Sequence, residues 1–450
     1  MILAFGCTRS PLGVVFLIIS LAIQRIHALQ LDLDNPQSIK DAAKIIVEGL
    51  VKHYPGTQPG QVPGLLPKPP YYWWLSGAMF GSLIDYWHFT GDTQYNNMTM
   101  EAMLFQVGED NNYMPRNQTL GLGNDDQCFW ALTAMTAAES KFPNPPSDKP
   151  QWLALVQAVL NSQIPRWDDK TCGGGLRWQA YSFNKGYDYK NSITNGCFTN
   201  IAARLALYTK NNTYAELAEK HWNWLDSAGL ISNSYQVFDG TWVTNCSRFD
   251  HIQWSYNSGV VLAAAAAMYN FTGSDVWKKR VEGLIKGGDI FFPNGVMAEV
   301  ACESNGKCNS DQRSFKAYLA RWMAYTIKLA PFTRETLLQR LRTSAKAAAA
   351  QCNGPGNVCG IRWTEGTYDG QPGVGQQMSA LEVIQSNLID HVAGPANNAT
   401  GISKGNPGAG TGKQRVVKVN AITTADRVGA GFLTAGILLA TLGAGWWMIS

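Results

Sequence analysis

Residues 77–89 read GAMFGSLIDYWHF, an apolar stretch with one charged residue, Asp85. Its small residues, among them Gly77, Ala78, Gly81 and Ser82, allow close approach by neighbouring segments. A helix that is apolar on nearly all sides belongs in a protein interior. We therefore predict a buried helix here, in which Asp85 needs a buried partner.

The segment before this stretch has a different pattern. Between residues 39 and 50 the apolar residues lie on one helical face, and Lys40, Lys44 and Glu48 lie on the opposite face. This alternation of an amphipathic helix with an apolar one continues along the chain. Further amphipathic helices are predicted at 95–106, 151–162, 214–226, 276–287 and 334–348. Further apolar helices are predicted at 126–138, 196–208, 256–269, 315–327 and 377–389.

A short repeat follows three of the apolar helices. The chain reads TGDTQY at 90–95, TKNNTY at 209–214 and TGSDVW at 272–277, with threonine five residues before an aromatic residue each time. Each copy is typical of a turn followed by a helix start. Six helical hairpins with apolar helices inside predict an all-α fold, an (α/α)6 barrel. The alternative is an open helical solenoid, whose inner helices would need a polar concave face.

Composition narrows the possible partners. Charged residues make up 16% of the chain and the net charge is +4, so the strong basic patch of a nucleic-acid-binding protein is not expected. The chain carries 16 Trp and 17 Tyr. Flat aromatic faces suit the apolar C–H patches of sugar rings, although tryptophan also fills large cores.

In such a barrel the N-terminal ends of the inner helices meet at one rim. The residues at these ends are aromatic rings, amides, carboxylates and glycines, which together are typical of a sugar site. They are YYWW at 71–74, GNDDQ at 123–127, residues 191–195, QWSYN at 253–257, NSDQ at 309–312 and GVGQQ at 373–377.

Two neighbouring acids on this rim suit glycoside cleavage, which needs one ionised and one protonated carboxyl group. Asp125 and Asp126 follow a glycine-rich turn, where a helix start helps to keep one of them ionised and their proximity favours a proton on the other. Neighbouring residues favour the short carboxyl spacing of a retaining enzyme. The alternative is that Asn124 and Asp125 only cap a helix. Such chemistry needs no cofactor and no metal.

Other acids have less specific interpretations. Asp168 and Asp169 lie beside a glycine run and are predicted to sit in a solvated loop. Glu299 and Asp311 are candidates for the rim, each with a capping or loop alternative.

The two ends of the chain predict export and anchoring. Residues 1–28 have the charge and apolar run of a signal peptide, with an N-terminal membrane anchor as the alternative. Residues 428–450 are an apolar tail behind a polar spacer, the layout of a GPI-attachment signal, with a tail-anchored protein as the alternative. Asn420 or Gly410 is the candidate attachment residue. Residues 29–392 form the predicted catalytic domain, and 393–427 a flexible linker with the GPI attachment region.

Cysteines and sequons agree with secretion. Cys7 belongs to the signal peptide, and the eight other cysteines suggest disulfides. Cys302 with Cys308, and Cys352 with Cys359, are the expected pairs because each closes a small loop. Predicted glycosylation sites are Asn97, Asn117, Asn211, Asn245, Asn270 and Asn398.

Several of these motifs together resemble glycoside hydrolase family 76, and in particular its fungal GPI-anchored branch of mannan endo-1,6-α-mannosidases. They are GNDDQ at 123–127, YYWW at 71–74 followed by GSLIDYW at 81–87, CGGGLRW at 172–178, QWSYN at 253–257 and FKAY at 315–318. The resemblance covers nearly the whole chain. It departs at Leu75-Ser76, where the family often has Glu-Ala, and a missing acid there would alter substrate contacts.

The resemblance implies a retaining (α/α)6 enzyme acting on α-1,6-mannosidic linkages in wall biogenesis, with Asp125 as nucleophile and Asp126 as general acid/base. It implies mannan or a GPI glycan as substrate, wall glucan as a possible acceptor in a transglycosidase, and a site at the outer face of the plasma membrane and cell wall. The expected substrate-binding residues are Trp73, Trp74, Trp178, Asn195, Trp254, Tyr256, Asn257, Asp311 and Gln312.

A third hypothesis belongs to another class of protein. A glycan-binding wall protein that keeps the barrel without catalysis would still bind mannan after Asp125→Asn or Asp126→Asn, with no loss of function. An enzyme would lose turnover in both variants. In either case a monomer is expected.

Overall fold

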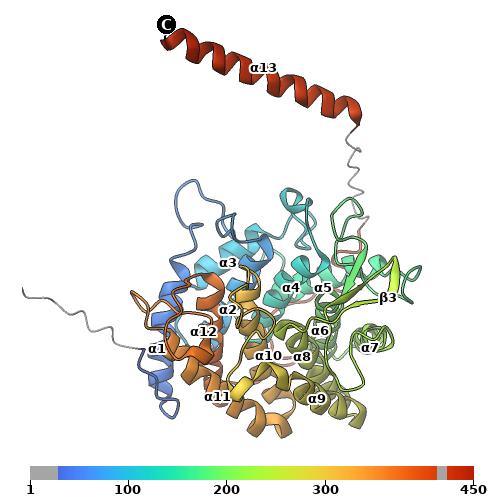
Figure 1. The fold of residues 1–450 in the computed structure, drawn as a ribbon. Coiled ribbons are helices and arrows are strands. Elements are labelled where there is room, and N and C mark those ends of the chain that lie inside the picture. Colours follow the sequence, from blue (N-terminus) through green and yellow to red (C-terminus); the bar gives the residue numbers. More distant parts are fainter. Residues whose placement is uncertain (1–28, 413–422, 450) are drawn as a thin grey trace, which may run out of the picture.

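The computed structural model describes residues 29–412 and 423–449. The predicted signal peptide and the candidate attachment residue Asn420 lie outside this part of the chain. Figure 1 shows all the described helices except the last packed together in one body.

The twelve predicted barrel helices are confirmed. The inner helices are α2 (Trp73–Thr90), α4 (Asn124–Glu139), α6 (Ser192–Thr209), α8 (Ser255–Thr272), α10 (Phe315–Leu329) and α12 (Val374–Gln385). The outer helices are α1 (Pro36–Val51), α3 (Asn96–Phe105), α5 (Trp152–Gln163), α7 (Asn212–Ser227), α9 (Asp275–Gly287) and α11 (Arg334–Gln351). Because α12 contacts both α1 and α2, the ring closes into a barrel and is not an open solenoid.

Short 3₁₀ helices join these elements. They are η1 (Arg116–Gln118), η2 (Ile164–Arg166), η3 (Gly288–Phe291), η4 (Pro293–Gly295), η5 (Gln312–Ser314), η6 (Pro331–Thr333), η7 (Trp363–Glu365) and η8 (Ser386–His391).

Burial follows the predicted division. Nearly every residue of α2 is buried, whereas α1 buries one face, including Ile39, Ile46 and Leu50. Asp85, the charged residue within α2, has the buried partner that its position requires. The guanidinium of Arg321 donates hydrogen bonds to Asp85 at 2.5 Å and to Glu382 at 2.6 Å. These buried ions are tolerated because they are paired with one another.

A small sheet is the main feature that periodicity did not predict. Its strands are β1 (Tyr189–Asn191), β2 (Gly240–Trp242) and β3 (Asn245–Asp250), which are antiparallel in the order β1-β2-β3. Tyr189 is paired with Trp242. With three residues each, β1 and β2 are too short to show an alternating pattern, so only the tertiary fold brings them together.

The disulfides agree in part with expectation. The pairs Cys302–Cys308 and Cys352–Cys359 are confirmed, and a third bond joins Cys172 to Cys246. Cys128 and Cys197 are buried thiols on α4 and α6. Every asparagine of the six sequons is exposed, as glycan attachment requires.

Residues 393–411, which we call the strap, differ from the flexible linker expected from their composition. The Ala396 N–H donates to the Glu139 carbonyl, and the Asn398 N–H donates to the Tyr208 carbonyl, both at 2.8 Å. Further along, the Leu153 N–H donates to the Ser403 hydroxyl at 3.0 Å. The strap is held because its polar backbone supplies partners to helix ends that would otherwise lack them.

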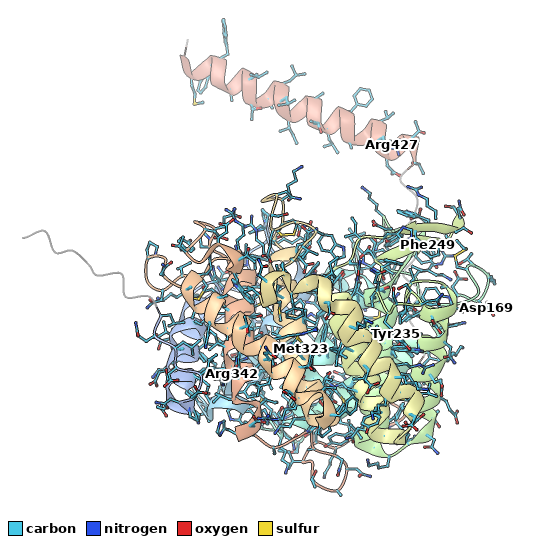
Figure 2. All side chains as sticks on the ribbon, turned by 60° about the horizontal axis from the view of Figure 1, so that its bottom comes forward. Asp169, Tyr235, Phe249, Met323, Arg342 and Arg427 are labelled. Carbon is cyan, nitrogen blue, oxygen red and sulfur yellow. A yellow bond between two sulfur atoms is a disulfide. The ribbon has the colours of Figure 1, made fainter. Side chains whose placement is uncertain are left out.

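The last helix, α13 (Thr424–Ile449), lies outside the barrel (Figure 1, Figure 2). Its segment Thr424–Met448 has a mean hydropathy of 1.7 in its most apolar window, none of which is buried. Among the described residues it is the one helix that is long and apolar enough to cross a membrane.

Candidate active site

A pocket of about 740 Å³ opens at the N-terminal ends of α4, α8 and α10. Its walls are aromatic and its floor is acidic. The lining residues are Trp74, Asp125, Asp126, Phe129, Trp178, Tyr189, Asn191, Asp239, Trp254, Tyr256, Asn309, Asp311, Gln312 and Phe315.

Asp125 and Asp126 lie in the first turn of α4. Gly123 is the N-cap residue, and its backbone N–H donates to Asp126 Oδ2 at 2.7 Å. The Asp126 N–H donates to Asp125 Oδ1 at 3.0 Å. The capping alternative named Asn124 and Asp125, whereas Gly123 is the N-cap and Asp126 is the acid that accepts from its N–H; both Asp125 and Asp126 also line the pocket. Capping and an acidic pocket coexist because a helix start stabilises negative charge.

The two carboxyls hold protons more tightly than ordinary aspartates. Burial and the charge of Asp126 raise the pKa of Asp125, against hydrogen bonds from backbone N–H groups and the Trp178 indole. Burial raises the pKa of Asp126 to about 7. Two carboxyls this close resist double ionisation. We therefore expect the pair to share one proton near neutral pH.

Gly123 has no room for a side chain. A Cβ atom at this position would lie 2.1 Å from Asp125 Oδ1. Glycine is therefore required here for the close approach of a carboxyl to the backbone, and not for an unusual backbone angle.

Asn124 ties α4 to the segment that carries Trp178. Its backbone N–H donates to the Trp178 carbonyl, and its side-chain amide donates to the Arg177 carbonyl, both at 2.8 Å. On the other side, the Trp178 N–H donates to the Tyr189 carbonyl at 2.7 Å. Trp178 is thus fixed between α4 and β1, beside Asp125.

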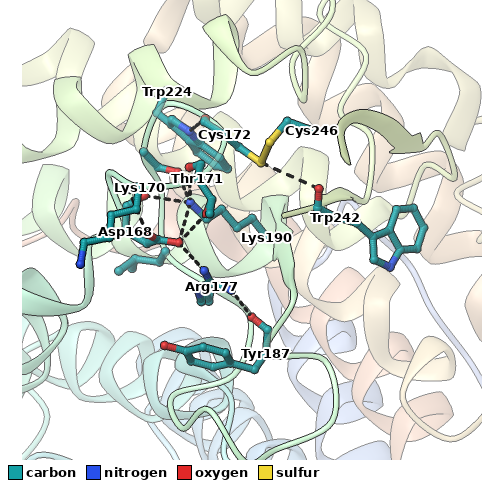
Figure 3. Close-up of polar contacts among 12 residues, drawn as sticks. Asp168, Lys170, Thr171, Cys172, Arg177, Tyr187, Lys190, Trp224, Trp242 and Cys246 are labelled. Carbon is teal, nitrogen blue, oxygen red and sulfur yellow. Dashed lines mark hydrogen bonds and ion pairs between the residues drawn. A yellow bond between two sulfur atoms is a disulfide. The ribbon is translucent and has the colours of Figure 1, made fainter. Parts of the chain in front are cut away.

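The loop before Trp178 is organised by the buried ammonium of Lys190 (Figure 3). The ammonium donates to the carbonyls of Asp168 at 2.9 Å, Thr171 at 2.7 Å and Gly174 at 2.5 Å. It also lies 3.3 Å from the Asp168 carboxylate, which Arg177 contacts at 2.8 Å. The three carbonyls and the Asp168 carboxylate all contact the ammonium of Lys190, so this loop is built around a buried cation.

The solvated loop expected at residues 168–169 is therefore wrong for Asp168, and only Asp169 is exposed. Although burial acts in the opposite direction, Thr171 and the charges of Lys190 and Arg177 lower the pKa of Asp168. Sequence analysis missed this buried ion pair because Lys190 is 22 residues away from Asp168 in the sequence.

Aromatic rings form the walls of the pocket. Tyr256 stacks on Phe315 with ring centroids 3.8 Å apart, and Trp254 meets the same ring edge-on. Trp74 packs against Phe129 at 4.7 Å. These rings line the pocket, and aromatic side chains suit the apolar patches of sugar rings.

Two further carboxyls face the pocket. Burial raises the pKa of Asp311 to about 6, against a hydrogen bond from the Trp74 side chain. Asp239 was missed by sequence reasoning. It accepts a hydrogen bond from the Tyr189 hydroxyl at 2.8 Å and one from the Asn257 amide at 3.3 Å, and burial raises its pKa to about 6. It precedes β2, a strand that left no sequence signal.

The structure brings six of the nine expected binding residues into the pocket, namely Trp74, Trp178, Trp254, Tyr256, Asp311 and Gln312. Trp73 points into the core, where its indole N–H donates to Gln106 and its ring stacks on Trp130. Asn195 is buried against the backbone of Leu176.

Asn257 acts from behind the pocket through Asp239. Glu299 also lies outside the pocket lining, where it accepts a hydrogen bond from the Ser255 hydroxyl at 2.5 Å. Leu75 and Ser76 are buried and do not line the pocket. The departure from the family pattern at these two positions therefore makes no contact with the pocket in this chain.

Comparisons with known proteins agree with this architecture. The model of glycosyl hydrolase family 76 matches residues 38–399. The chain is 45% identical to mannan endo-1,6-alpha-mannosidase DCW1 of Saccharomyces cerevisiae, over 97% of this chain and 98% of that protein. It is 43% identical to the DCW1 protein of Candida albicans, over 97% and 99% of the two chains.

Solved structures show the same fold. The structure of Dfg5 from Chaetomium thermophilum in complex with glucosamine matches with a TM-score of 0.82 and 48% identity, covering 84% of this chain and 97% of that one. An inactive variant of the alpha-1,6-mannanase GH76A of Salegentibacter sp. HEL1_6, in complex with alpha-1,6-mannotriose, matches with a TM-score of 0.63 and 16% identity, covering 78% and 99%. On the family match and on these identities over nearly full length, the chain belongs to glycosyl hydrolase family 76.

Proposed function

We propose that this chain is a retaining mannan endo-1,6-α-mannosidase in which Asp125 is the nucleophile and Asp126 the general acid/base. The observation that carries the proposal is a pair of adjacent carboxyls with raised pKa values on the floor of an aromatic pocket. The curated relatives with 40–46% identity carry this activity in their names, which supports the choice of substrate.

The chemistry divides between the two carboxyls. Asp125 attacks the anomeric carbon while Asp126 gives its proton to the leaving glycosidic oxygen, which leaves a covalent mannosyl-enzyme. Asp126, now a carboxylate, takes a proton from the incoming hydroxyl group as the ester bond to Asp125 breaks. A pKa of about 7 suits a group that must give and take a proton in turn.

The rest of the pocket is suited to hold the sugar chain. In this proposal Trp74, Trp178, Trp254 and Tyr256 stack on mannose rings, and Asp311 and Gln312 accept or donate hydrogen bonds to hydroxyl groups. Asp239 joins them as a further hydroxyl partner.

The incoming hydroxyl belongs either to water or to another sugar. Water gives hydrolysis, and a wall glucan hydroxyl gives transfer of the mannan or of a GPI glycan onto the wall. We rank hydrolysis first and keep transfer as the second candidate, because a covalent intermediate in an open pocket serves both.

We also propose that the mature protein is attached at the outer face of the plasma membrane by a C-terminal anchor. The apolar, unburied α13 and the three disulfides support this location.

Product analysis tests the function. Linear α-1,6-mannan oligosaccharides are incubated in ¹⁸O-water with a glucan oligosaccharide, and the products are weighed by mass spectrometry. Shorter mannans carrying ¹⁸O, absent with Asp125→Asn, are the expected result. Unlabelled mannan joined to glucan would make the protein a transglycosidase. Intact substrate with retained binding would leave a glycan-binding wall protein and overturn the proposal.

A further inference from the structure

The direction of α5 defines two ends of the barrel. At its C-terminal end, the Gln163 side chain donates to the Asn124 carbonyl at 2.8 Å, beside the catalytic pair. The other end of α5, at Trp152, lies near the C-terminal ends of the inner helices. We call these the pocket end and the far end.

The strap crosses from the far end to the pocket end. Ser403 accepts from the N–H of Leu153 in the first turn of α5, whereas the Asn161 amide in its last turn donates to the Ala409 carbonyl at 2.8 Å. Between them, Gln157 accepts from the strap at 2.6 Å. This is a climb of roughly 12 Å along the helix. The chain therefore leaves the barrel at the pocket end.

Apolar side chains are exposed at the same end. Leu120 is 77% exposed, and Ile164 and Phe183 are each 38% exposed. We call these three residues the rim patch. The loops that carry Leu120 and Phe183 are joined, since the Asn184 amide donates to the Thr119 carbonyl at 3.0 Å. In Figure 1 these loops lie at the top of the barrel. Apolar side chains are exposed at the far end as well, among them Val276 and Phe332, so the position of the chain exit, and not exposure alone, selects the pocket end.

We propose that the pocket end of the barrel faces the lipid bilayer and that the rim patch contacts its headgroup region. The proposal rests on the C-terminal membrane anchor proposed above, and it does not require catalysis. Leucine, isoleucine and phenylalanine side chains gain free energy at a membrane interface, where their apolar parts leave water.

The length of the tether favours this orientation. The longest inner helices have 18 residues and stand about 27 Å tall. Attachment at Gly410 leaves no free chain beyond the strap. From Thr411 to Asn420 a fully extended chain reaches at most ~35 Å. If the far end faced the membrane, the tether would have to run back along the height of the barrel. That path would use most of the length of the tether.

The sequons divide unevenly between the ends. Bulky, hydrophilic glycans are compatible with the end that points away from a bilayer. The asparagines at the far end are Asn97, Asn211, Asn270 and Asn398. Those at the pocket end are Asn117 and Asn245. Because Asn117 lies close to Leu120 in the sequence, contact of the rim patch with lipid requires this sequon to carry no glycan, and Asn117→Gln should leave the energy transfer from position 120 unchanged.

Energy transfer to the membrane tests the orientation. The full chain, held by its own anchor in phosphatidylcholine vesicles with a headgroup acceptor dye, is labelled at Leu120→Cys or at Val276→Cys on the far end. Cys128 and Cys197 are buried and stay unlabelled in the folded protein. Transfer should be strong from position 120 and weak from position 276. Equal transfer, or the reverse order, would overturn the proposal.

A second pair of variants tests the rim patch itself. With the label moved to Ile252→Cys at the pocket end, Leu120→Ser with Phe183→Ser should lower the transfer. The matched far-end control, Val276→Ser with Phe332→Ser, should not. If neither pair of substitutions changes the energy transfer, the rim patch does not contact lipid.

Turnover of soluble α-1,6-mannan oligosaccharides is measured in the same samples. Because energy transfer needs no catalysis, its outcome is separate from that of the proposed function. Strong transfer from position 120 without turnover would remove the enzyme and keep the membrane orientation. Turnover with weak energy transfer from position 120 would keep the proposed enzyme and overturn the membrane orientation.

Discussion

At the scale of single residues, Gly123 sets the position of Asp125, the proposed nucleophile. In Gly123→Ala the new methyl group would overlap Asp125 Oδ1, so the carboxyl must move. A displacement of about 1 Å costs on the order of 100-fold in rate. We expect kcat to fall by about this factor while mannan binding changes little. Gly288→Ala, where a Cβ meets no atom within 4 Å, is the control and should keep full activity.

As the proposed general acid/base, Asp126 should set the alkaline limit of catalysis. Its pKa of about 7 means that the proton required for the leaving group is lost as the pH rises through 7, and kcat/KM should fall there. Asp126→Asn should retain cleavage of an aryl mannoside whose leaving group needs no proton, whereas Asp125→Asn should not. A wild-type rate that stays constant from pH 6 to 9 would contradict this role.

At the scale of elements, Lys190 joins β1 to the loop that carries Trp178. Lys190→Met leaves three carbonyls without their donor and Asp168 with Arg177 as its remaining cation, which costs about 3 kcal/mol of stability. We also expect a higher KM, because Trp178 loses its support. Lys170→Met, an exposed lysine of the same loop, is the control for both measurements. Lower stability with an unchanged KM would mean that the loop does not position the substrate wall.

The strap is the second element with a measurable contribution. Ser403→Ala removes the acceptor for the N–H of Leu153 at the start of α5, and the loss of a helix-end partner costs about 1 kcal/mol. Chemical unfolding of the protein should detect this difference. Lys404→Ala, at an exposed neighbour, should leave the unfolding free energy unchanged. Two variants of equal stability would mean that the strap is not docked in solution.

At the scale of the whole molecule, buried acids make stability depend on pH. Burial raises the pKa of Glu299 to about 8 and that of Asp239 to about 6, above the usual value of about 4 in an unfolded chain. Between pH 4 and these raised pKa values, the folded state holds protons that the unfolded state has released. The free energy of unfolding therefore falls as the pH rises through this range. Tm should therefore decrease by several degrees from pH 5 to pH 8. Glu299→Gln should flatten this slope, and a Tm that rises over the range would contradict the assignment.

Local patterns in the sequence determined much of this protein. Helical periodicity is a property of neighbouring residues, so the twelve barrel helices and their inner and outer faces could be predicted. The adjacent acids Asp125 and Asp126 at a helix start were predicted for the same reason, as were the two disulfides that close small loops.

Only the tertiary structure decided which groups meet. Trp73 and Trp74 are neighbours, yet successive residues of a helix point about 100° apart, so one fills the core and the other lines the pocket. Asp239 reaches the site from the residue just before β2, and Lys190 neutralises a distant Asp168. The strap looked flexible because its composition is polar, but its hydrogen-bond partners lie on helices far away in the sequence. Contacts of this kind depend on long-range packing, which no local pattern records.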